Sequence, residues 1–239
     1  MNSDLVVDEL HASYGAFEAV RGISLSISPG TITALFGHNG AGKTTTLRVI
    51  AGLKKAASGN VRFGDRDVAQ LPASARARLG LALMPDGARG VFPTLSVGQN
   101  LELARAISRS GDGAHGPSDE SLLDELFGDV LRGRAKQPAS SLSGGERQML
   151  ALCLAVVRRP AWLLLDEPAL GLAPKAVDRL MSAIGALPQR LGTAILIVEQ
   201  GIGPVLKIAD TVTIMKSGSL VTAMPAAACP PPQDLWRYF

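Results

Sequence analysis

The sequence predicts an α/β fold that combines a parallel central sheet, an antiparallel β layer near the N-terminus and a helical insert. Two continuous apolar runs, 162–165 and 194–198, are typical of strands buried on both faces of a parallel sheet. Apolar residues alternate strictly over 23–28, which indicates a strand with one buried face. The segments 101–107 and 121–131 have helical character and interrupt the strand pattern. An antiparallel layer is therefore expected beside an α/β core that carries a group of helices.

The chain of 239 residues is long enough for one domain with a small subdomain. We expect a single domain over 1–239, into which a helical subdomain of about 97–157 is inserted. A loose surface loop is predicted at 108–119, because this stretch is polar and contains glycine.

The C-terminal part is predicted to contain a hairpin and then a tail. The apolar segments 211–215 and 220–222 flank a turn that contains glycine. An irregular tail of about 225–239 follows, which is first rich in Ala and Pro and then aromatic. The aromatic residues either pack on their own domain or dock on a partner, and the sequence leaves both possibilities open.

Composition argues against several classes of protein. Hydrophobic residues make up 46% and charged residues 19% of the chain, as in a globular domain. No apolar stretch approaches the ~20 residues of a membrane helix, and we expect no secretory signal. Cys153 and Cys229 are too few for a disulfide framework, which favours a reducing cytosol. The net charge of +3 is spread over short clusters, so we expect no nucleic-acid partner.

A glycine-rich loop gives the first functional signal, because it fits the phosphate-binding pattern G-x-x-x-x-G-K-[ST]. Its residues, together with the threonine that follows, are Gly37, His38, Asn39, Gly40, Ala41, Gly42, Lys43, Thr44 and Thr45. A β-rich apolar run at 31–36 precedes the loop, and a helix-compatible segment at 43–51 follows it. This context disfavours the alternative, which is a glycine-rich turn with an incidental lysine.

The chemistry of such a loop suits a nucleotide. Glycines let the backbone close around a phosphate, so that its N–H groups and the N-terminus of the new helix face the anion. Lys43 is expected to contact the β- and γ-phosphates, and the hydroxyl of Thr44 to ligate Mg²⁺. The chain is therefore expected to bind a nucleoside triphosphate.

Two acidic residues follow the first continuous apolar run. Asp166 closes the strand at its C-terminal tip, where it is placed to hold Mg²⁺ beside Thr44. Glu167 comes next, where a carboxylate can polarise the attacking water as a general base. Alone, the pair is equally well explained as an acidic cluster at a helix N-terminus. The phosphate loop favours the catalytic interpretation.

The segment 142–148 is the most specific element of the chain. Ser143 and Glu146 fit a capping box that opens a helix, and the simplest interpretation is a well-capped helix. Gly144 and Gly145 argue against it, because they leave the N–H groups and the positive end of the helix open to a phosphate. One nucleotide does not need two such sites, so this site is expected to serve the nucleotide of a second copy.

The combination of GxxxxGKT, LSGGE and an apolar strand ending in DEP resembles the ABC ATPases over nearly the whole chain. The resemblance implies a P-loop NTPase core with a helical signature subdomain, and hydrolysis of ATP with Mg²⁺ as a cofactor. It implies two subunits that enclose two ATP molecules, so that Ser143, Gly144, Gly145 and Glu146 serve the partner's ATP. Tyr14 matches the aromatic residue that stacks on adenine, although an ordinary tyrosine at a strand end is the alternative.

Several segments are similar to the importer ATPases for branched-chain amino acids, the LivF type. They are 84–87, 125–127, 166–174 and 198–200. Most ABC ATPases carry Asp at the position of Ala173 and His at the position of Gln200, whereas this subgroup usually has the residues found here. Because Gln200 cannot titrate, the resemblance implies that it positions the γ-phosphate while Glu167 handles the proton. The alternative is a polar residue at a strand end.

Asp86 departs from the family pattern. It stands where the family has Gln, or Glu in the subgroup, at a position that touches Mg²⁺ and reports to the membrane subunit. Asp is one methylene shorter than Glu, and Gly90 resembles a one-residue insertion, so whether Asp86 reaches the metal stays open. Leu154 stands where Arg is usual, with no evident functional reason.

The resemblance implies an ATP-hydrolysing subunit of an ABC importer that lies in the cytoplasm on the inner face of the membrane. Its expected partners are a second ABC ATPase subunit, in a hetero- or homodimer, transmembrane permease subunits and, indirectly, a solute-binding protein. Branched-chain amino acids or a related small polar solute are the expected cargo, which the sequence does not identify. Two other functions stay open, namely a soluble ABC ATPase that acts as a mechanical switch and a non-catalytic nucleotide-binding regulator.

Overall fold

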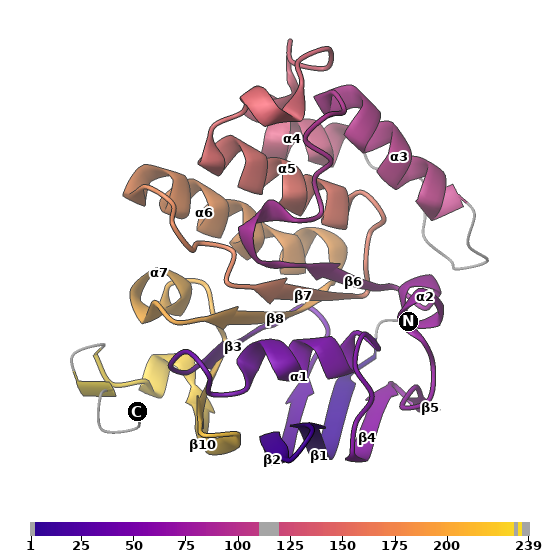
Figure 1. Ribbon diagram of the computed structural model, residues 1–239. Helices are drawn as coiled ribbons and strands as arrows, with labels where there is room; N and C mark the ends of the chain where they lie inside the picture. Colours follow the sequence, from indigo (N-terminus) through magenta and orange to yellow (C-terminus); the bar gives the residue numbers. More distant parts are fainter. Residues whose placement is uncertain (1–2, 110–119, 232–233, 236–239) are drawn as a thin grey trace.

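Two β-sheets and the helices between and above them form the molecule (Figure 1). The computed structural model describes residues 3–109, 120–231 and 234–235. One sheet has four strands in the order β2-β1-β4-β5, and the other has six in the order β10-β9-β3-β8-β7-β6. The predicted α/β architecture with an added antiparallel layer is confirmed.

The four-stranded sheet is antiparallel throughout. Its strands are β1 (Leu5–Tyr14), β2 (Phe17–Ile27), β4 (Ser58–Phe63) and β5 (Arg66–Asp67). In β2 the predicted alternation is present, since Ile23 and Ile27 are buried whereas Ser24 and Ser26 are exposed. The turn between β1 and β2 brings Tyr14 opposite Phe17, next to the phosphate loop.

The six-stranded sheet is the centre of the molecule. Its strands are β3 (Ile32–Phe36), β6 (Leu81–Met84), β7 (Trp162–Asp166), β8 (Ala194–Glu199), β9 (Thr211–Lys216) and β10 (Ser219–Pro225). All are parallel except β10, which forms the predicted hairpin with β9. Every residue of β3, β7 and β8 is buried, as the continuous apolar runs predict. The carboxyl ends of these strands therefore meet at one edge.

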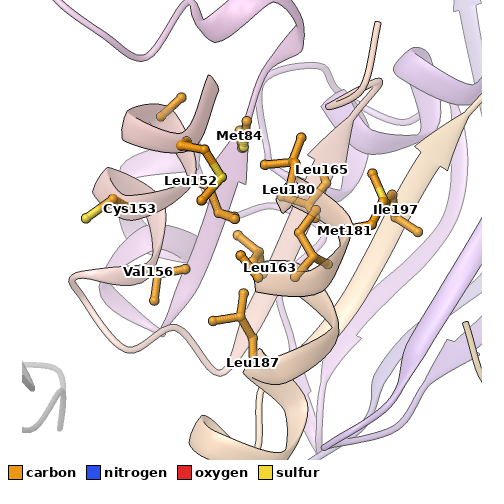
Figure 2. Packing of buried hydrophobic residues seen from close by; sticks show 14 of the residues in the cluster. Met84, Leu152, Cys153, Val156, Leu163, Leu165, Leu180, Met181, Leu187 and Ile197 are labelled. Carbon is orange, nitrogen blue, oxygen red and sulfur yellow. The ribbon is translucent and has the colours of Figure 1, made fainter. Parts of the chain in front are cut away.

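The helices divide between the two faces of this sheet. They are α1 (Lys43–Ile50), α2 (Ala73–Arg78), α3 (Val97–Arg109), α4 (Glu120–Leu131), α5 (Gly144–Val156), α6 (Pro174–Leu191) and α7 (Ile202–Leu206). Helix α1 lies between the central sheet and the antiparallel sheet, whereas α5 and α6 cover the opposite face (Figure 1). Side chains of α5 and α6 pack there on β7 and β8 (Figure 2). No helix among the described residues is long and apolar enough to span a membrane.

Most predicted boundaries hold to within a few residues. Helix α3 begins at Val97 and ends at Arg109, so the predicted start of the loop at 108 was wrong by two residues. The remainder of that loop, 110–119, lies outside the described residues. In the predicted tail a 3₁₀ turn occupies Ala226–Ala228, and Leu235 is buried in the core. The aromatic residues that follow Leu235 are also outside the described residues.

Candidate active site

The phosphate loop joins the end of β3 to the start of α1. Gly40 and Gly42 adopt φ angles of 82° and 108°, which L-residues avoid. Gly42 is the N-cap of α1 and offers no side-chain cap, so the first N–H groups of the helix stay available to an anion. The predicted strand–loop–helix context is therefore present.

Lys43 is folded back into this loop. Its side chain is 4% exposed, and its Nζ donates to the carbonyl oxygens of Gly37 at 2.8 Å and His38 at 3.2 Å. The same Nζ lies 3.3 Å from Oε1 of Glu167, with which it forms an ion pair. The lysine and the predicted general base are thus direct neighbours, and each satisfies the charge of the other.

Thr44 and Asp166 form the second contact of the site. The Thr44 hydroxyl donates to Oδ1 of Asp166 at 2.9 Å. Burial raises the pKa of Asp166, and the negative charges of Asp86 and Glu167 raise it further, against the lowering effect of the Thr44 hydrogen bond. A cation bound beside this buried carboxylate would favour its charged form.

Asp86 lies within electrostatic reach of Asp166, although β6 and β7 bring the two together from distant parts of the chain. It opens a 3₁₀ turn (Asp86–Ala88) after β6 and pairs with Arg89 at 3.1 Å. The turn contains two residues with positive φ, Gly87 at 63° and Ala88 at 55°. Asp86 thus shares the site with Asp166 while its carboxylate is partnered by Arg89.

The donor set fits Mg²⁺. This ion prefers oxygen ligands and is usually held by one or two carboxylates together with phosphates and water. Thr44 and Asp166 supply a hydroxyl and a carboxylate that already touch, and Asp86 lies close to them. Within the described ranges no group of three or more His, Cys, Asp or Glu is placed to hold a metal.

A cavity of about 200 Å³ opens beside the loop. It is lined by the loop, Glu167 and two exposed aromatic residues, Tyr14 and Phe17. Lys54 is not among its lining residues, and its Nζ lies 3.9 Å from the centre of the Tyr14 ring. Lys54 also donates to the carbonyl of Ser13 at 2.6 Å, which fixes it there. A hydrogen bond from Thr45 holds the pKa of Tyr14 below its usual value.

Phe17 was not predicted as a site residue. Its position three residues after Tyr14, across the β1–β2 turn, was the signal that could have identified it. With 62% of its surface exposed, it adds an apolar wall to the cavity that no packing requirement explains.

The segment 142–148, called the signature segment below, has the predicted capping box. Ser143 Oγ accepts from the N–H of Glu146 at 3.3 Å, and the N–H of Ser143 donates to Glu146 Oε2 at 2.9 Å. The N–H of Ser143 and its hydroxyl, which donates to the same Oε2 at 2.8 Å, lower the pKa of Glu146, with a further contribution from Arg134. A Cβ on Gly145 would lie 2.8 Å from that of Ala176, so the second glycine is also required by close packing. Helix α5 therefore has both the capping box and an N-terminus that Gly144 and Gly145 leave without side chains.

The signature segment and the phosphate loop belong to opposite faces of the central sheet. Helix α5 packs in the core of one face, and α1 packs in the core of the other (Figure 1). Ser143, Gly144 and Gly145 therefore open a helix on one face of the sheet, whereas Lys43 opens a helix on the other.

Gln200 follows β8 directly and is exposed. Phe36 pairs with Glu199 in the register of β3 and β8, so Gln200 comes level with Gly37 at the start of the phosphate loop. Gln200 therefore lies at the same edge of the sheet as the phosphate loop.

Glu199 is a second residue that was not predicted. Its side chain is only 5% exposed, and its Oε1 accepts from the N–H of Ala169 at 2.8 Å. Burial raises the pKa of Glu199 to about 7, and the charge of Glu167 adds to this, while Ala169, Gln200 and Lys43 oppose it. Its place directly after the continuous apolar run 194–198 was the sequence signal that could have identified it.

The raised pKa predicts an unusual pH dependence of stability. Because native Glu199 binds its proton more tightly than the unfolded chain does, the native state loses stability as the pH rises from about 4.5 to about 7. In Glu199→Gln this loss is absent, so the variant should gain roughly 2–4 kcal/mol over wild type between pH 5 and pH 8. Urea unfolding of nucleotide-free protein at both pH values measures the gain. Glu102→Gln, which changes an exposed carboxylate of α3, should show none.

Comparison with known proteins identifies the family. The model of the ABC transporter family matches residues 20–170. The "High-affinity branched-chain amino acid transport ATP-binding protein BraG" of Pseudomonas aeruginosa is 37% identical over 217 residues, 91% of each chain. The "Probable branched-chain amino acid transport ATP-binding protein LivF" of Archaeoglobus fulgidus is 36% identical, over 88% of this chain and 87% of that protein. The "Fe(3+) ions import ATP-binding protein FbpC" of Rhizobium etli is 37% identical, over 87% of this chain and 57% of that protein.

Solved structures show the same fold. The ADP conformation of MJ1267, an ATP-binding cassette of an ABC transporter, superimposes with a TM-score of 0.78 at 24% identity, over 92% of this chain and 90% of that one. The dimeric structure of MJ0796, a bacterial ABC transporter cassette, has a TM-score of 0.79 at 19% identity, over 93% of this chain and 98% of that one. At such identities the likeness concerns the fold alone. The family match over more than half of the sequence, together with this fold, shows that the chain belongs to the ABC transporter family and is an ATP-binding, ATP-hydrolysing subunit of a transporter.

Proposed function

We propose that this subunit drives solute import by hydrolysing MgATP at the cluster of Lys43, Thr44, Asp166 and Glu167. The observation that carries the proposal is the contact between Lys43, the proposed phosphate-binding cation, and Glu167, the proposed general base. The contact of Thr44 with Asp166 supplies a place for the metal next to them.

Binding of ATP would rearrange these contacts. The γ-phosphate competes with Glu167 for the ammonium group of Lys43, because both are anions and the phosphate carries more charge. Glu167 is then released to accept a proton from the attacking water. Gln200 follows β8 at the edge where the γ-phosphate would lie, so its amide would orient the phosphate without titrating. Bound Mg²⁺ would neutralise charge on the β- and γ-phosphate oxygens.

The signature segment is proposed to act on the ATP of a second ABC ATPase subunit. The positions of α1 and α5 on opposite faces of the sheet support this, because one subunit does not close both segments on one nucleotide. The dimer reported for MJ0796 is consistent with such an arrangement. The proposed partner is a second copy of this chain or a related ABC ATPase subunit.

A second cavity, of about 260 Å³, is proposed as the place where a permease subunit docks. It lies between β6 and the helices α3 and α5, and includes Phe92, Leu103 and Leu154. Phe92 is 53% and Leu103 is 37% exposed, which leaves an apolar surface open to a partner. Pro85 and Gly90 also line the cavity, so a docked permease subunit would contact the loop that carries Asp86. Leu154, which departs from the family pattern, contributes to this apolar lining.

Branched-chain amino acids or a related small polar solute are the proposed cargo. BraG and LivF match this chain along nearly their whole length, whereas FbpC extends well beyond the matched part. The subunit would lie in the cytoplasm on the inner face of the membrane, with a solute-binding protein as an indirect partner.

Affinity purification of the tagged chain from gently solubilised membranes tests this function. Two multi-span proteins and a second ABC ATPase should co-purify, and the associated solute-binding protein can then be tested with leucine and with Fe³⁺. Recovery of soluble partners alone would contradict the importer and favour a mechanical switch without a transporter.

The cavity predicts a role for Tyr14 in binding the base. In Tyr14→Ala, loss of the stacking face should raise the KM for ATP about 10-fold and leave kcat within about 2-fold, since base–aromatic stacking contributes ~1–3 kcal/mol. Steady-state ATPase measurements separate the two constants. Tyr14→Phe keeps the ring and should retain the wild-type KM, whereas an unchanged KM in both variants would exclude Tyr14 from base binding.

A further inference from the structure

The turn that follows β7 is tied to the end of β8 by two hydrogen bonds. The N–H of Glu167 donates to the carbonyl of Val198 at 2.9 Å. The N–H of Ala169 donates to Oε1 of Glu199 at 2.8 Å. The first bond continues the pairing of the parallel strands, in which Asp166 is opposite Val198. The second bond is made by a side chain, so it depends on the residue at position 199.

Glu199 occupies a position that is unfavourable for a carboxyl group. All six residues of β8 are buried, and the five before Glu199 are apolar. Transfer of a carboxyl group from water to such a place costs free energy unless hydrogen bonds compensate. An apolar residue would avoid this cost. The carboxyl group is therefore explained by the backbone N–H groups that it binds, not by packing.

The turn that Glu199 holds carries the proposed general base. Glu167 has a φ of 44°, a conformation that is strained for a residue with a side chain. The turn has internal bonds from Leu170 to Glu167 and from Leu172 to Ala169, both at 3.2 Å. Leu170 is 60% exposed, whereas Pro168 is buried and Ala169 and Leu172 pack against the core. The bond from Ala169 to Glu199 anchors the middle of the turn to the sheet.

We infer that Glu199 is a positioning residue for ATP hydrolysis, which fixes the turn 167–172 against β8 and so holds Glu167 beside Lys43. The inference rests on the proposed role of Glu167 as general base. Glu199 does not itself touch the reacting atoms. It acts through Ala169, whose N–H it binds, and through the backbone that leads to Glu167.

Two substitutions in the full-length protein test the inference. Glu199→Leu keeps the side chain buried but removes the acceptor, so kcat for ATP hydrolysis should fall about 10- to 100-fold through misplacement of the base. The dissociation constant for ATP should change less than about 3-fold, because the phosphate loop is intact. Glu199→Gln keeps an acceptor oxygen for Ala169 and should retain kcat within about 3-fold.

Site-resolved hydrogen exchange gives a readout that does not depend on activity. The amide of Ala169 should exchange slowly in wild type and in Glu199→Gln, and at least about 10-fold faster in Glu199→Leu. Asp210→Leu is the matched control, since Oδ2 of Asp210 likewise accepts a backbone N–H, that of Ile32 in β3, at 2.8 Å. This control should lower the melting temperature without lowering kcat. If Glu199→Leu does not fold, Glu199→Asp withdraws the acceptor by one methylene and is measured in the same way.

The outcomes separate the inference from the proposed function. Wild-type kcat in folded Glu199→Leu, or unchanged exchange of the Ala169 amide, overturns the inference while hydrolysis by Glu167 stands. A parallel fall of kcat in Glu199→Gln would also overturn it, because it would show that charge, not the hydrogen bond, is required. Normal hydrolysis in Glu167→Gln would instead remove the proposed function on which the inference rests.

Discussion

Glu167→Gln is expected to lower kcat for ATP hydrolysis by about 10²- to 10⁴-fold, the usual contribution of a general base. Glutamine has nearly the shape of glutamate and keeps a hydrogen-bond acceptor, so the turn after β7 should be undisturbed. What is lost is the ability to accept the proton of the attacking water. Phosphate release at saturating MgATP measures this loss.

Binding of ATP should survive the same substitution. Glu167 is paired with Lys43 at 3.3 Å, and it also adds negative charge beside Asp166. A neutral amide releases the lysine and removes repulsion toward the γ-phosphate, so the dissociation constant for ATP should be unchanged or lower. A fluorescent ATP analogue titrated with and without Mg²⁺ measures it.

Asp166→Asn is the matched control, because it removes the neighbouring carboxylate. Asp166 is the proposed metal residue that contacts Thr44, so this variant should weaken binding mainly when Mg²⁺ is present. Equal rates of hydrolysis in Glu167→Gln and wild type would contradict catalysis by Glu167 and favour a nucleotide-binding regulator.

The parts of this site that sequence alone predicts are those set by local rules. Glycines followed by Lys43 and Thr44 specify a loop before a helix, because positive φ angles and a bare helix N-terminus are properties of a few adjacent residues. Ser143 and Glu146 specify a helix start for the same reason, and both bonds of the capping box are present. Continuous apolar runs likewise identify β7 and β8 as buried strands.

The parts that sequence does not supply depend on which strands become neighbours. Asp86 comes close to Asp166 because β6 pairs with β7, and no local pattern specifies that pairing. Glu199 reaches the turn after β7 because β7 and β8 are adjacent and in register. Phe17 joins the cavity because the β1–β2 turn lies over the phosphate loop. Whether the signature segment serves its own nucleotide or that of a partner likewise depends on the face of the sheet that α5 covers.

Gly42→Ala is expected to raise the dissociation constant for ATP at least about 100-fold. A Cβ at this position would lie 2.4 Å from the carbonyl oxygen of Ala19 and 2.6 Å from Cε of Met215. The methionine can move, but the carbonyl belongs to β2, so the loop itself must shift. The φ of 108° adds strain of roughly 1–2 kcal/mol for any L-residue.

The shift would reach the phosphate site through the start of α1. The carbonyl of Gly42 accepts from the N–H of Thr46 at 2.9 Å and from its hydroxyl at 3.0 Å, so displacing Gly42 displaces the first turn of the helix. Gly40→Ala separates the effect of backbone strain from that of a steric clash. Gly40 has a φ of 82°, but no atom lies within 4 Å of its added Cβ. Its affinity for ATP should fall less than about 10-fold. Titration with a fluorescent ATP analogue, together with thermal melts of both variants, makes the comparison. Equal losses in the two would mean that backbone strain alone, and not the contact with β2, requires glycine at the end of the loop.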